Sequence, residues 1–195
     1  MPGSNALRDF CDTLVRLIDT LNYTLGEIIK WALPLLVLSV AFSVFALSIF
    51  GLSWTKLFES AQYLHSSVIM CGAAATLLAG QHVRVDIFHA RMSPEQRALI
   101  DFCGFYALLL PVCLTILWNS GSFIALSWRI FEGSAEADGI RGEFLLKTLI
   151  PLFGLFMIMQ GMAIALRAAF LMGGHPCPER PGDVRPLFGQ QESGR

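Results

Sequence analysis

The side chains best suited to chemistry gather in one polar stretch, GQHVRVDIFHARMSPEQR, at residues 80–97. Histidines, arginines and carboxylates stand there between two long apolar runs. His82, Asp86 and His89 have the donor atoms of a metal site, but the helical His-x-x-x-His spacing is missing and no cysteine is near. The sequence therefore predicts no metal site in this stretch.

The sequence also gives little support for a catalytic or haem-binding site. It contains no Gly-x-Ser-x-Gly, His-Glu-x-x-His or P-loop motif. Haem bound by two histidines needs ligands on separate membrane helices at matching depth, and His65 is the only histidine expected inside a span. We predict no catalytic residue, no bound cofactor and no enzyme activity. A membrane-anchor or haem-binding subunit of a redox complex is the alternative function.

The polar stretch fits a turn between two membrane helices. In HVRVDIF, polar and apolar residues alternate, which predicts extended chain with Arg84 and Asp86 on one side. Ser93-Pro94-Glu95-Gln96 predicts a helix start, with Ser93 as the N-cap and Gln96 completing a capping box. Since basic loops commonly meet anionic lipid, the arginines of the stretch are candidates for contacts with lipid headgroups. They are Arg84, Arg91 and Arg97.

The segments around this turn are those of a membrane protein. Of the 195 residues, 54% are hydrophobic and 15% are charged, whereas soluble domains are about 25% charged. The mean hydropathy is +0.58, and the net charge of −1 gives no reason to expect a nucleic-acid partner. We predict an all-α membrane protein with four transmembrane helices. The expected spans are 31–54, 57–80, 98–128 and 144–171, each near or above the roughly 20 residues that a bilayer requires.

The ends of the chain differ in character from this four-span membrane domain, which we place at residues 30–172. Residues 1–29 follow a 3–4 spacing of apolar residues that predicts an amphipathic helix at the membrane interface. A cytosolic extension continuous with the first span is the alternative for this segment. Residues 173–195 are rich in proline, glycine and charge, which predicts a flexible cytoplasmic tail.

The distribution of positive charge predicts the topology. Four spans put both termini on one side of the membrane. Ten of the 14 Lys and Arg residues would lie on that side, so the positive-inside rule makes both termini cytoplasmic. The acidic segment FEGSAEADGIRGE, residues 131–143, would then face outward.

Several polar and small residues inside the spans are candidates for helix contacts. Glu59, Gln62 and Ser66 share one helical face. Glu59 could pair with Lys147 across two spans, or either group could meet another subunit, since ionisable groups inside membranes are usually paired. The candidate subunit-interface residues are Glu59, Gln62, Ser66, Lys147 and Gln160. Small residues that permit close helix packing are Gly72, Ala75, Gly154 and Gly161.

The segment GQHVRVDIFHARMSPEQRALIDF resembles the signature of the small membrane subunit, of DctQ type, of tripartite ATP-independent periplasmic (TRAP) transporters. Its core consists of His82, Val83, Arg84, Val85 and Asp86. FESAQYL before the signature, EGS after Trp128 and LKTLIP…QG near the C-terminus add to the resemblance, which covers residues 31–171. Ser60-Ala61-Gln62 departs from the family pattern, which puts the local packing there in question.

The resemblance implies a subunit without chemistry of its own in the inner membrane of a bacterium. It implies three partners: a large TRAP membrane subunit, a periplasmic substrate-binding protein and membrane lipids. The imported organic acid and the coupled sodium ion would bind to the large subunit. This chain would enlarge the fixed scaffold against which the transport domain moves.

Overall fold

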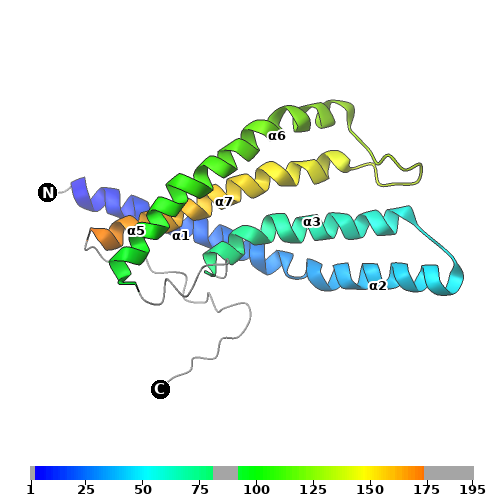
Figure 1. The fold of residues 1–195 in the computed structure, drawn as a ribbon, viewed down its shortest axis with the longest axis horizontal. Helices are drawn as coiled ribbons and strands as arrows, with labels where there is room; N and C mark the ends of the chain where they lie inside the picture. The colour runs from blue at the N-terminus through cyan, green and yellow to red at the C-terminus, as the bar shows by residue number, and fades with distance from the viewer. Residues whose placement is uncertain (1–2, 81–91, 174–195) are drawn as a thin grey trace, which may run out of the picture. The chain divides into compact units, whose positions relative to one another are not determined.

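The computed structural model describes residues 3–80 and 92–173. Every regular element in those two ranges is a helix, as the sequence predicts (Figure 1). In chain order they are α1 (Gly3–Ile29), α2 (Ala32–Phe50), α3 (Thr55–Leu78), α5 (Pro94–Gly104), the π-helix η1 (Phe105–Leu109), α6 (Leu110–Ile130) and α7 (Glu143–Met172). The predicted cytoplasmic tail lies outside the described residues beyond position 173.

The boundary between α1 and α2 is a single tight turn at Lys30 and Trp31. Lys30 N–H still donates to Gly26 O at 3.0 Å, and Trp31 N–H donates to Ile28 O at 3.2 Å. At its other end α2 stops at Gly51, whose φ of 64° is left-handed and suits glycine. The first predicted span therefore begins and ends within a few residues of α2.

The segment 94–130 is helical throughout but not uniform. Ser93 is the N-cap of α5, and its predicted capping box is confirmed: Gln96 N–H donates to Ser93 Oγ at 3.3 Å, and Ser93 N–H donates to Gln96 Oε1 at 3.0 Å. One wider π-turn, η1, precedes Pro111. Proline has no N–H for the regular ladder, and π-turns and prolines are known sites of helix distortion. The helix thus widens by one π-turn just before Pro111.

Three stretches are long and apolar enough to cross a membrane among the described residues: Arg8–Phe50, Glu95–Ile130 and Glu143–Met172. The prediction of four such spans is wrong by this measure. The predicted span 57–80 does form a helix, α3, but polar side chains such as Glu59, Gln62 and His65 lower its hydropathy. The first of the three stretches also joins α1 to α2, whereas the sequence predicts a separate interfacial helix in residues 1–29, with a continuous extension as the alternative.

The chain divides into two compact units. The first contains residues 1–24, 74–112 and 157–195, and the second contains residues 25–73 and 113–156. Helices α1, α3, α6 and α7 each contribute to both units, so the division does not follow the predicted segments. The described polar clusters fall into one unit or the other and are treated separately below.

Candidate functional site

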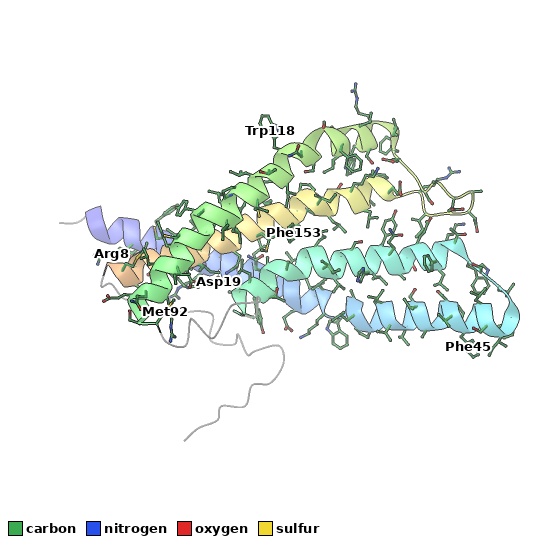
Figure 2. All side chains as sticks on the ribbon, in the orientation of Figure 1. Arg8, Asp19, Phe45, Met92, Trp118 and Phe153 are labelled. Atoms are coloured by element: carbon green, nitrogen blue, oxygen red, sulfur yellow. The ribbon has the colours of Figure 1, made fainter. Side chains whose placement is uncertain are left out.

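A buried polar cluster joins α1 to the C-terminal half of α7 in the first unit. Asp19 and Gln160 have no exposed surface, and Asn22 and Arg167 are also buried. Asn22 Nδ2 donates to Gln160 Oε1 at 2.8 Å, and Gln160 Nε2 donates to Asp19 Oδ1 at 3.1 Å. Arg167 completes the chain of contacts, with Nη1 3.4 Å from Asp19 Oδ1 and Nη2 bonded to Oδ2. Figure 2 labels Asp19 on α1.

The cluster satisfies charges that the apolar surroundings would otherwise penalise. Its neighbours are apolar side chains: Val15, Ile18 and Ala163 form a buried core, with Leu166 packed against it. A charge in such a place is tolerated only when it is paired and hydrogen-bonded. The fork of the Arg167 guanidinium matches the two oxygens of Asp19, which is the geometry that makes such pairs strong.

The face of α1 that packs against α7 is not the apolar face that the 3–4 spacing defines. Val15, Ile18, Asp19 and Asn22 turn inward, whereas four of the apolar residues at 3–4 spacing are exposed and Leu14 and Leu25 are half-buried. The exposed residues are Phe10, Leu17, Leu21 and Ile28. The physical reason is the Arg167 charge on α7, because Asp19 must face it. Asp19 and Arg167 were missed as functional residues. The available signal was Gln160 and Arg167, polar residues seven apart on one face of an apolar helix.

Glu59 organises the loop between α6 and α7, residues 131–142, in the second unit. Its Oε1 accepts a hydrogen bond from the Ser134 hydroxyl, and its Oε2 accepts one from the Ile140 N–H at 2.5 Å. Ser134 N–H in turn donates to Ile140 O at 3.1 Å, which closes the loop on itself. Lys56, one turn before Glu59, contacts Asp138 of the same loop at 2.7 Å. The start of α3 therefore holds the loop between α6 and α7.

Lys147 has a different partner from the one considered in the sequence. It forms an ion pair with Glu132 and lies 4.3 Å from the centre of the Phe123 ring. Glu59 and Lys147 are each bound elsewhere and do not pair with one another. The hydrogen bond from the Lys147 ammonium lowers the pKa of Glu132. The pair therefore stabilises the fold above the unfolded pKa of glutamate, and the contribution is lost as the pH falls through the lowered value.

The four residues predicted to permit close helix packing differ in how near the neighbouring side chains lie. A Cβ on Gly161 would lie 2.5 Å from Phe105 Cδ2, so only glycine fits against the π-turn. A Cβ on Gly154 would lie 3.2 Å from Leu117 Cγ, and one on Gly72 would lie 3.8 Å from Ile29 Cγ2. Ala75 is buried.

The remaining predicted site residues are distributed as follows. The family motif His82–Asp86, with Arg84 and Arg91 as candidate lipid contacts, lies outside the described residues. Arg97 is in the first turns of α5 and is exposed. Gln62 is exposed and Ser66 is half-buried, whereas Gln160 belongs to the buried cluster. In the two described ranges, no group of three or more His, Cys, Asp or Glu residues could hold a metal ion.

Both polar clusters thus hold parts of the chain together: the first joins α1 to α7, and the second joins the start of α3 to the loop between α6 and α7. A comparison with known families shows which class of protein contains them. Residues 36–171 match the model of the DctQ component of tripartite ATP-independent periplasmic transporters. The chain belongs to the DctQ family. No curated protein and no solved structure matches it.

Membership of the DctQ family settles the broad class of the protein. The matched region contains α3 to α6 and nearly all of α2 and α7. The chain is a small membrane subunit of a TRAP transporter, and the family is a transporter component rather than an enzyme family. The alternative of a redox-complex anchor receives no support from this match.

Removing one partner of the Asp19–Arg167 pair is expected to destabilise the protein strongly. Asp19→Asn removes the carboxylate charge that the buried Arg167 guanidinium contacts, and breaking a buried pair in this way typically costs about 3–5 kcal/mol. The exposed pair Glu27–Lys30 is the matched control, and Glu27→Gln should cost no more than about 1 kcal/mol. Thermal unfolding of the detergent-purified protein measures both.

A charge swap separates pairing from packing in the same experiment. Asp19→Arg combined with Arg167→Asp should recover part of the stability that either single change loses. Equal losses for Asp19→Asn and Glu27→Gln, or a double variant worse than both singles, would contradict the assignment of this pair.

Proposed function

We propose that this chain is the scaffold subunit of a sodium-coupled TRAP transporter that imports an organic acid. The proposal rests on the contacts that the charged side chains make within the chain. Asp19 and Arg167 bind each other, Lys147 binds Glu132, and Glu59 binds its own outer loop. Charges committed to fastening helices are suited to a rigid support. Substrate and sodium would then bind to a large membrane subunit.

The outer loop is the proposed contact for a periplasmic substrate-binding protein. Glu59, Lys56 and Lys147 hold it from three positions, so its exposed acidic residues are presented in a fixed arrangement. Glu136 and Asp138 are exposed on it. A pre-organised loop loses less conformational entropy on binding than a flexible one. A loop that binds a periplasmic protein must face the periplasm, so we propose that the chain lies in a bacterial inner membrane.

We further propose that α3 crosses the membrane as a protein-covered helix, which places both termini in the cytoplasm. Two contacts support this within the second unit: Lys56 with Asp138 and Glu59 with Ser134 bring the start of α3 to the outer loop. The polar residues of α3 would then contact protein instead of lipid. The exposed apolar residues of α1, such as Phe10 and Leu17, would lie in the membrane interface.

Cysteine labelling tests the crossing of α3. In a background without native cysteines, Ser53→Cys should react with a membrane-impermeant maleimide added to intact spheroplasts. Gln96→Cys should react only after the membrane is opened, because α3 carries the chain to the other side. Equal reactivity of both positions in intact spheroplasts would rule out the crossing.

Recovery of a large partner tests the proposed subunit role. When the affinity-tagged chain is purified in mild detergent from cells that express the transporter genes together, a large hydrophobic permease should copurify in fixed proportion. A tagged membrane protein of similar size and unrelated family is the control. Purification of the chain alone, under conditions that keep it folded, would contradict the role.

A further inference from the structure

One exposed stripe on α3 differs from the other outward faces of the helices. It consists of Phe58, Gln62, His65 and Ile69, which follow the spacing i, i+4, i+7 and i+11 and so lie on one face. Phe58 is 73% exposed and Ile69 is 51% exposed, and Gln62 and His65 are exposed between them. We refer to these four residues as the α3 stripe.

The two polar members of the α3 stripe lie deep along the helix. Gln62 and His65 come seven and ten residues after Thr55, the first residue of α3. At 1.5 Å per residue, they lie about 10 and 15 Å from its outer end. Within the described residues, neither side chain forms a hydrogen bond or an ion pair. If α3 crosses the membrane, both polar groups stand at the depth of the hydrocarbon.

Lipid hydrocarbon is an unfavourable environment for the side chains of Gln62 and His65. Lipid tails offer neither donors nor acceptors, so a buried amide or imidazole facing them keeps its full desolvation penalty. Polar side chains in membrane helices therefore usually face protein. A neighbouring helix can hydrogen-bond to glutamine and histidine while its apolar side chains cover Phe58 and Ile69.

The outward face of α2 has the opposite character. Leu38 and Phe45 are seven residues apart on one side of α2, and they are 65% and 52% exposed. Phe45 projects from α2 on the side away from α3 (Figure 2). The serines Ser39 and Ser43 are bonded within the α2–α3 pair: Ser39 Oγ lies 3.4 Å from Ser60 Oγ, and Ser43 donates to Ser39 O at 2.8 Å. This face suits lipid.

The other polar residues considered for subunit contacts are already used. Glu59 and Lys147 bind the outer loop and its border, and Gln160 belongs to the buried cluster of the first unit. Gln62 is the one of that set that is exposed, with Ser66 half-buried beside it. His65 joins Gln62 on geometric grounds alone.

We propose that the α3 stripe is the surface on which a transmembrane helix of the large subunit packs. That helix supplies hydrogen-bonding side chains to Gln62 and His65 and apolar side chains to Phe58 and Ile69, while the outward face of α2 contacts lipid. The inference rests on the proposed function, because it assumes that a large membrane subunit is present. It also rests on the proposed crossing of α3.

Photo-crosslinking in native membranes locates the contact without altering the polar pair. A benzoylphenylalanine probe replaces Phe58 or Ile69 on α3, and the control probes replace Phe45 or Leu38 on α2. The α3 probes should form adducts with the large subunit at several-fold higher yield than the α2 probes. Equal or higher yields from α2, or α3 adducts only with lipid or with a second copy of this chain, would overturn the inference.

Substitution of the polar pair gives an independent readout. Gln62→Leu with His65→Leu should lower the amount of large subunit recovered with the tagged chain several-fold, because the hydrogen bonds of the contact are lost. Leu38→Val with Phe45→Leu, both on the outward face of α2, should not. If the unaltered chain recovers the large subunit and the α3 variant recovers as much, the inference fails and the proposed function stands. If the unaltered chain recovers none, the proposed function fails, and the inference fails with it.

Discussion

The ion pair between Asp19 and Arg167 is the interaction on which the arrangement of α1 depends. The two charged side chains are buried, and their pairing offsets the cost of removing both charges from water. Gln160 and Asn22 extend the pair into a hydrogen-bonded chain. The rotation of α1 follows from this: Asp19 points towards α7, and the larger apolar side chains of α1 are left on the outside. A leucine stripe alone would have allowed several rotations.

In the second unit, charged side chains also fix a local arrangement. Glu59 uses both carboxylate oxygens to hold the outer loop, and Lys147 and Glu132 pair at the base of that loop. The loop begins at Phe131, whose φ of 46° is unusual for a residue other than glycine. Such a conformation persists when the surrounding contacts fix it. A loop held in this way is a suitable docking surface, and helices fastened by their own charges are a suitable support for a moving partner.

The sequence predicts the helices well because their signals are local. Apolar runs, the Ser93 capping box and the glycine after α2 each act over a few residues. The partners of the charged groups could not be predicted, because they depend on which helices meet. The sequence suggested that Glu59 could pair with Lys147 across two spans, but each side chain binds a nearer group in the loop between α6 and α7. The number of apolar spans was overestimated for a related reason: α3 has helical length, but its polar residues need contacts that hydropathy does not represent.

The central claim is that this chain supports transport without carrying out any step of it. Reconstituted uptake tests this most directly. The large subunit and its binding protein are placed in vesicles under a sodium gradient, with and without this chain, and the initial rate of uptake of an organic acid is measured per large subunit. We expect a large loss of rate without the chain, and recovery when it is added back before reconstitution. Full-rate uptake in its absence would show that the chain is not needed as a support.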